Sequence, residues 1–186
     1  IRDRSPSRGL GDVYKRQVVI GVALQPAFTS GRFEPSEYAP YTAGDTIYAL
    51  EEQTGGRIKV EDIMPLGCSH PLCDTGTFLM PDDEGGYIPA TRGLSSEEYM
   101  QYYDPTSPQG SVLPDILYKK GVNLYHGISV IIMNYMDAMT TTIERMAECS
   151  MTVAMKDGRV IPFCSYQMTN SAGERIYEMW GTGPTA

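Results

Sequence analysis

Short apolar runs alternate with polar segments rich in glycine and proline, a pattern that predicts mixed α and β structure. Residues 18–24 form the first run, and its three valines and the following Gln25-Pro26 predict a buried strand. Residues 128–136 are mostly apolar and β-branched at their start, which predicts a second strand, with a buried helix as the alternative. Residues 75–80 and 87–89 predict two more strands, joined by an acidic glycine-containing turn.

Helix signals fall between these runs. Thr42 and Asp45 are spaced as a capping box and predict a helix that ends near residue 53, where Gly55 and Gly56 can adopt left-handed conformations. Further short helices are predicted within residues 60–65, 95–103, 113–120 and 140–147.

Length and charge narrow the class of protein. The 186 residues suffice for one domain, or for one domain plus part of another, and the formal net charge of −8 argues against nucleic-acid binding. The longest apolar run is too short to span a bilayer and ends too abruptly for a secretory signal. We therefore expect a cytoplasmic protein without a transmembrane segment.

Residues 1–17 differ in composition from the rest of the chain. They hold five basic and two acidic residues, whereas the other 169 hold ten basic and 21 acidic. They resemble a translated cloning or assembly adapter, so we expect a non-native or disordered leader and a missing N-terminal part of the natural protein.

The four cysteines carry the candidate chemistry. Cys68 and Cys73 flank a four-residue loop stiffened by Pro71, and Cys149 and Cys164 form a second pair. In a reducing compartment, paired cysteines favour a metal over a disulfide. The spacing leaves open a shared zinc or iron–sulfur site and, alternatively, ordinary buried thiols.

An Asp-Gly pair at residues 157–158 predicts the hairpin that carries the second cysteine pair. A two-residue turn would pair Lys156 with Arg159 and place Cys149 and Cys164 diagonally on one face. Diagonal Cα atoms lie about 7–8 Å apart, which is awkward for a disulfide and suits two thiolates beside a metal.

His70 lies inside the first cysteine loop. Four cysteines would already fill a site. We therefore expect His70 either to donate a hydrogen bond to a metal-ligating residue or to be merely exposed. The 11 methionines fit core packing better than metal ligation.

Several sequence blocks together resemble the C-terminal part of one group of radical SAM proteins, the group that contains the tetraether lipid synthase and the dihydropterin methylase-like proteins. The matching blocks are Leu24-Gln25-Pro26 with Gly31-Arg32, residues 51–56, Met64-Pro65-Leu66-Gly67-Cys68-Ser69-His70-Pro71-Leu72-Cys73, and Asp157-Gly158-Arg159-Val160-Ile161-Pro162-Phe163-Cys164. The two cysteine blocks are fairly specific when they occur together in this order.

The resemblance implies an α+β fold in which residues 18–35 end a radical SAM α/β barrel and residues 36–186 form a small auxiliary iron–sulfur domain. It implies a cluster, [4Fe–4S] in type, ligated by Cys68, Cys73, Cys149 and Cys164. S-adenosylmethionine would be bound by the full-length protein, because the SAM-cleaving Cys-x-x-x-Cys-x-x-Cys motif does not occur in these 186 residues.

The sequence is therefore consistent with two functions from different classes. The first is part of a radical SAM enzyme that carries out C-methylation or carbon–carbon coupling on a small lipid-like or pterin-like substrate, bound through the missing barrel. The second is a stand-alone interaction module with a structural zinc site.

Overall fold

The computed structural model describes residues 19–27, 41–67, 69–103, 112–170 and 172–177. The predicted leader, residues 1–17, lies outside this part of the chain. The described residues combine helices with a mixed sheet, and none of their helices is long and apolar enough to cross a membrane. The division into a barrel end and an auxiliary domain stays a prediction.

Both kinds of secondary structure are short. The strands are β1 (Gly21–Leu24), β2 (Met64–Pro65), β3 (Asp74–Pro81), β4 (Tyr87–Pro89), β5 (Ile128–Met133), β6 (Thr152–Ala154) and β7 (Val160–Pro162). The α-helices are α2 (Ala43–Gln53), α3 (Ser96–Tyr102), α4 (Val112–Lys119), α5 (Ile143–Ala147) and α6 (Phe163–Gln167). Two 3₁₀ turns, η1 (Val60–Asp62) and η2 (Leu124–His126), complete the set.

The main sheet has the strand order β1-β5-β3-β2, and β4 pairs with the far end of β3. β1 runs parallel to β5, whereas β3 runs antiparallel to β5 over six residue pairs, from Asp74 with Met133 to Leu79 with Ile128. The start of β3 and the end of β5 therefore meet at one end of the sheet.

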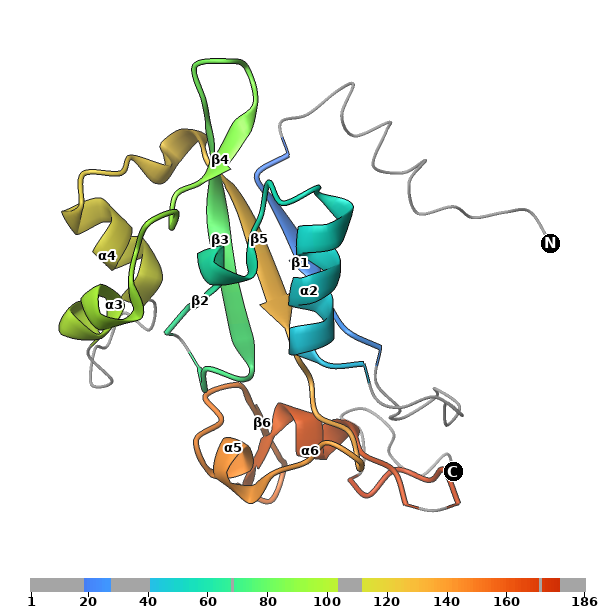
Figure 1. The fold of residues 1–186 in the computed structure, drawn as a ribbon. Helices are drawn as coiled ribbons and strands as arrows, with labels where there is room; N and C mark the ends of the chain where they lie inside the picture. The colour runs from blue at the N-terminus through green and yellow to red at the C-terminus, as the bar shows by residue number, and fades with distance from the viewer. Residues whose placement is uncertain (1–18, 28–40, 68, 104–111, 171, 178–186) are drawn as a thin grey trace.

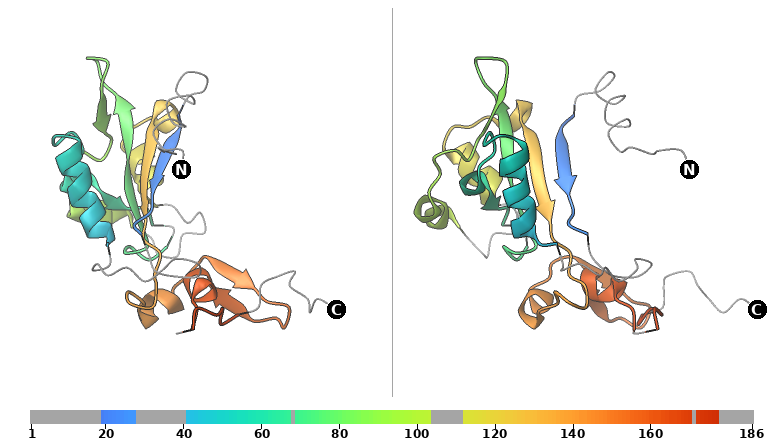
Figure 2. Two further views of the ribbon diagram at one scale, coloured as in Figure 1. Left: turned by 90° about the vertical axis from the view of Figure 1, so that its right-hand side faces the viewer. Right: turned by 45° about the vertical axis from the view of Figure 1, so that its right-hand side comes forward.

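The other elements surround this sheet unequally (Figures 1 and 2). Helix α2 lies in front of the sheet in Figure 1, and α3 and α4 lie together on the side of β2 and β3. The C-terminal segment, from α5 to α6, lies below the sheet in all three views. The lower end of the sheet, where β3 starts, thus faces the C-terminal segment.

The apolar core lies between the helices α3 and α4 and the strands β2 and β3. Its most deeply buried side chains are those of Leu113, Ile116 and Leu117, all fully buried on α4. They cluster with Met64, Leu66, Leu94 and Tyr99. This core holds α4 against the sheet and leaves the C-terminal segment outside it.

Several local predictions are confirmed. Thr42 caps α2, and the Asp45 carboxylate accepts a hydrogen bond from the Thr42 N–H at 2.8 Å, which completes the predicted capping box. Gly55 and Gly56 have the expected positive φ angles of 61° and 77°. Ser95 caps α3 by accepting a hydrogen bond from the backbone of residue 98.

Two strand predictions need correction. β1 is not buried: its Val22 is 37% exposed, and Ile20, which precedes the strand, is 79% exposed. It pairs only with β5 among the described residues, so its apolar side chains lie at a sheet edge. The strand predicted over residues 128–136 ends at Met133, where the chain turns toward the C-terminal segment.

The hairpin of β6 and β7 also differs from its prediction, by one residue. Thr152 pairs with Pro162, and the Met155 N–H donates to the Arg159 carbonyl at 2.8 Å, so the loop has three residues instead of two. Gly158, with a φ of 85°, closes this longer loop. β7 ends at Pro162, so Cys164 lies in α6 and has no diagonal partner in a ladder.

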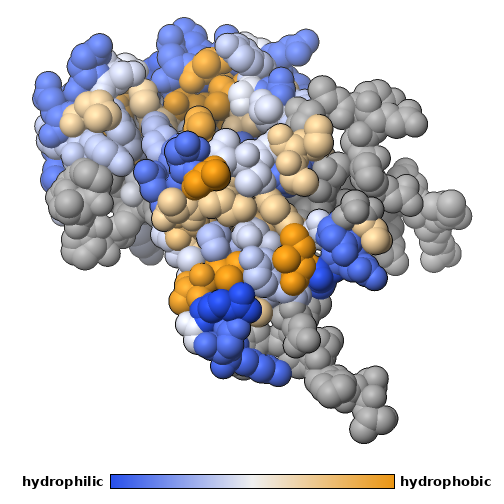
Figure 3. Space-filling model, turned by 90° about the horizontal axis from the view of Figure 1, so that it is seen from below, coloured by the Kyte–Doolittle hydropathy of each residue, from blue (hydrophilic) through white to orange (hydrophobic). Residues whose placement is uncertain are grey.

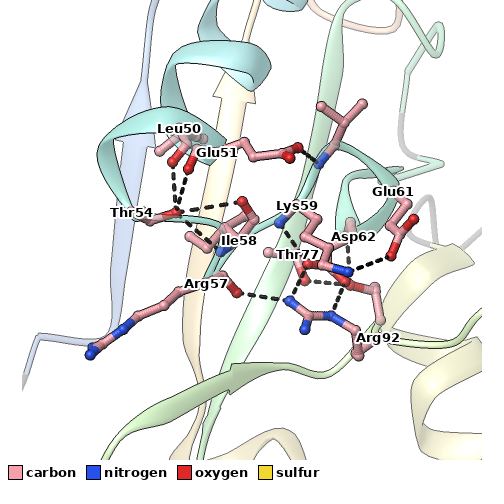
Figure 4. Close-up of polar contacts among 12 residues, drawn as sticks. Leu50, Glu51, Thr54, Arg57, Ile58, Lys59, Glu61, Asp62, Thr77 and Arg92 are labelled. Carbon is pink, nitrogen blue, oxygen red and sulfur yellow. Dashed lines mark hydrogen bonds and ion pairs between the residues drawn. The ribbon is translucent and has the colours of Figure 1, made fainter.

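An ion pair between the exposed Arg92 and a buried carboxylate joins η1 to the loop after β4 (Figure 4). Asp62 is fully buried, and its two carboxylate oxygens each accept a hydrogen bond of 2.6 Å from the Arg92 guanidinium. Arg92 also donates to the Arg57 carbonyl at 2.8 Å, and the Lys59 N–H donates to Asp62 at 2.7 Å. The carboxylate beside it raises the pKa of Arg92. The pair ties together two segments about 30 residues apart in the sequence.

We expect Arg92→Met to destabilise the fold by about 3 kcal/mol, because it leaves the buried Asp62 carboxylate without its cation. Urea denaturation followed by circular dichroism would measure the loss. The control is Lys59→Met, which removes only an exposed pair with Glu61 and should cost less than about 1 kcal/mol. Equal effects of the two substitutions would contradict this role for the Arg92–Asp62 pair.

A second test concerns Gly76, in the middle of β3. A Cβ atom there would lie 2.2 Å from the Val130 carbonyl oxygen, which belongs to the backbone of β5 and cannot rotate away. Gly76→Ala should therefore cost about 1–3 kcal/mol. Gly44→Ala, in α2, meets nothing closer than 3.5 Å and should be neutral or stabilising in the same denaturation experiment.

Candidate metal centre

One cavity lies between the lower end of the sheet and the C-terminal segment. It has a volume of about 380 Å³, and the thiols of Cys73, Cys149 and Cys164 line it. Its apolar wall is made by Met133, Tyr135, Met151 and Phe163. Seen from this end, the surface mixes hydrophobic and hydrophilic side chains (Figure 3). The cavity thus brings together cysteines that the sequence separates by up to 91 positions.

The main sheet positions Cys73. The residue ends a turn closed by a hydrogen bond of 2.7 Å from its N–H to the His70 carbonyl, and β3 begins at the next residue. The Cys73 carbonyl in turn accepts a 2.8 Å hydrogen bond from the N–H of Asn134, just beyond β5. Two strands of the sheet therefore hold the first cysteine loop against the segment that follows β5.

The C-terminal segment positions the other two thiols. Cys149 follows α5, and its thiol donates to the Met151 carbonyl at 3.0 Å. Cys164 lies in the first turn of α6, where its sulfur accepts a hydrogen bond of 3.4 Å from the Met136 N–H. Both cysteines reach the cavity, although the hairpin register predicted for them is wrong.

The three described cysteines are free thiols, and Cys164 is the buried one. Cys68 lies outside the described residues, so its place relative to the cavity stays a prediction. Within the described residues, no three His, Cys, Asp or Glu side chains converge closely enough to hold a metal ion. The donor chemistry nevertheless suits iron–sulfur clusters, which cysteine thiolates hold.

The cavity has a low polarity that acts on its titratable groups. Burial raises the pKa of the Cys164 thiol, and the nearby Cys149 and Cys73 thiols act in the same direction. The Met136 N–H and the Arg145 guanidinium oppose this shift. Burial likewise raises the pKa of Tyr135, whose ring packs 5.5 Å from that of Phe163, centre to centre. Burial and the two neighbouring thiols therefore disfavour the thiolate form of Cys164.

His70 lines the same cavity. Its Nδ1 accepts a hydrogen bond of 3.1 Å from the Leu72 N–H, so the ring proton of the neutral form lies on Nε2. Nε2 is 4.0 Å from a carboxylate oxygen of Glu148, which precedes Cys149. His70 thus lies between the two cysteine-bearing segments. Its expected hydrogen bond to a metal-ligating residue stays a prediction.

Arg145 is a residue of this site that the sequence did not single out. It is 5% exposed, and its Nε donates to the Cys73 sulfur at 3.3 Å. The available signal was its position four residues before Cys149, a spacing that places two residues on one face of a helix.

A comparison with known proteins finds a distant relative of this chain. The chain is 26% identical over 212 residues to the 7,8-dihydro-6-hydroxymethylpterin dimethyltransferase of Methanocaldococcus jannaschii. That match covers 80% of this chain and 42% of the relative, so the chain spans less than half the length of that protein. No protein-family model matches the chain.

We expect the three described thiols of the metal-free protein to differ in reactivity. Alkylation should modify Cys164 last, because it is the buried thiol and because only the thiolate attacks. A time course with iodoacetamide, read by peptide mass spectrometry, would rank the cysteines. A faster reaction at Cys164 than at Cys73 and Cys149 would contradict the described burial.

Proposed function

We propose that this chain is part of a SAM-dependent radical methyltransferase that acts on a pterin-like substrate. In this proposal the described residues hold an auxiliary [4Fe–4S] cluster ligated by Cys68, Cys73, Cys149 and Cys164. The observation that carries the proposal is that Cys73, Cys149 and Cys164 line one cavity.

The geometry supports a shared site in two ways. The three thiols come from the turn before β3, from the chain just after α5, and from α6. Local packing does not explain why three such separate segments share one cavity. Cys68 lies outside the described residues; it precedes Cys73 by five residues in the sequence and would supply the fourth thiolate. Four thiolates complete the usual ligand set of a [4Fe–4S] cluster.

The residues around the thiols fit an anionic, electron-accepting group. When bound, an iron–sulfur cluster supplies one-electron redox chemistry. Apolar side chains such as Met133 and Phe163 line the cavity, and the Met136 N–H already donates to the Cys164 sulfur. Such hydrogen bonds and apolar walls are the protein's means of adjusting cluster potentials.

The similarity to a pterin dimethyltransferase supports methyl transfer to a pterin-like compound over carbon–carbon coupling on a lipid. SAM cleavage is assigned to the part of the full-length protein outside these 186 residues, because the three-cysteine motif does not occur here. The described residues would therefore contribute the auxiliary cluster and not the radical-generating step.

Anaerobic reconstitution of the full chain with iron and sulfide should yield roughly four iron and four sulfide per protein, with a visible charge-transfer absorption. Cys73→Ser should lose most of the iron, because it removes one thiolate from the set. The matched control is Ser69→Ala, in the same loop and on the same cavity, which should retain the iron.

Two outcomes would count against the proposal. Equal iron retention in Cys73→Ser and Ser69→Ala would remove Cys73 from the ligand set. Stoichiometric zinc after purification, with no iron chromophore after reconstitution, would favour the structural zinc module instead.

A further inference from the structure

Arg145 is a buried cation with an unusual set of partners. Its Nε donates to the Cys73 sulfur at 3.3 Å, and its Nη2 donates to the Asn134 carbonyl at 2.6 Å. Asn134 is the residue whose N–H binds the Cys73 carbonyl. One guanidinium on α5 therefore contacts both the cysteine sulfur and the backbone that anchors the cysteine loop.

The charge of Arg145 is not neutralised by a carboxylate among the described residues, since none of their ion pairs includes it. Arg145 is only 5% exposed. A buried cation is costly unless an anion or strong acceptors compensate it. Arg92, by contrast, binds the buried Asp62 carboxylate through two hydrogen bonds. The acceptor at Arg145 that can become an anion is the Cys73 sulfur.

We propose that Arg145 is a positioning residue for Cys73, which holds its sulfur at the cavity and stabilises added negative charge there. The inference rests on the proposed cluster. When the cluster gains one electron from an external reductant, its charge becomes more negative by one unit. A guanidinium donating to a ligand sulfur favours this reduced form and raises the reduction potential.

The contact of Arg145 with Cys73 depends on the shape of the guanidinium as well as on its positive charge. Arg145 uses two nitrogens of one rigid fork, Nε for the sulfur and Nη2 for the carbonyl. A lysine ammonium keeps the positive charge but does not reproduce the fork. Lysine should therefore restore only part of the effect that a neutral residue abolishes.

The test compares the reconstituted full chain with its Arg145→Gln and Arg145→Lys variants, by dithionite titration followed by absorption and electron paramagnetic resonance. The midpoint potential should shift to more negative values in Arg145→Gln, and by a smaller amount in the same direction in Arg145→Lys. The control is Arg57→Gln, which removes the same charge from an exposed residue lining a different cavity and should leave the potential unchanged.

A wild-type potential in both Arg145 variants at wild-type iron content would overturn the inference while leaving the proposed cluster intact. If Arg145→Gln does not fold, the midpoint potential of Arg145→Lys is the test, and a wild-type value in that variant overturns the inference. Failure of the unmodified chain to bind iron and sulfide would overturn the proposed function itself, and the inference with it.

Discussion

The antiparallel pairing of β3 with β5 is the constraint on which the rest of the structure depends. It continues one residue beyond the strands, where the Asn134 N–H donates to the Cys73 carbonyl. Gly76 permits the close approach of the two backbones, since a side chain there would meet the Val130 carbonyl. The same pairing that builds the sheet therefore presents Cys73 to the C-terminal segment.

Two arginines in different surroundings illustrate different uses of charge in this molecule. Arg92 is matched by the Asp62 carboxylate, and the pair closes a structural contact between η1 and the loop after β4. Arg145 faces a carbonyl and a thiol instead. In the proposed site, a guanidinium that donates to a ligand sulfur stabilises negative charge there. The contrast suggests that Arg92 serves stability and that Arg145 serves the cavity.

The C-terminal segment lines the cavity and lies outside the apolar core. Among the described residues, the core cluster of α4, β2 and β3 includes none of its side chains. Its thiols, by contrast, face Cys73 across the cavity. A group bound by these thiols only in the folded state would add its binding free energy to the docking of this segment. Binding and local folding are therefore expected to be coupled here.

The sequence by itself determined the features that act over a few residues: the Thr42 cap, the Gly55-Gly56 stop, the strand at β3 and the candidate cysteines. Only the tertiary structure decided the exposure of β1, the place of Cys164 on α6 and the contact of Arg145 with Cys73. The hairpin shows the reason. The Asp-Gly signal predicted a turn correctly, but one extra loop residue changed its register. Local propensities specify elements, whereas register, burial and contacts between distant segments depend on packing that no short stretch encodes.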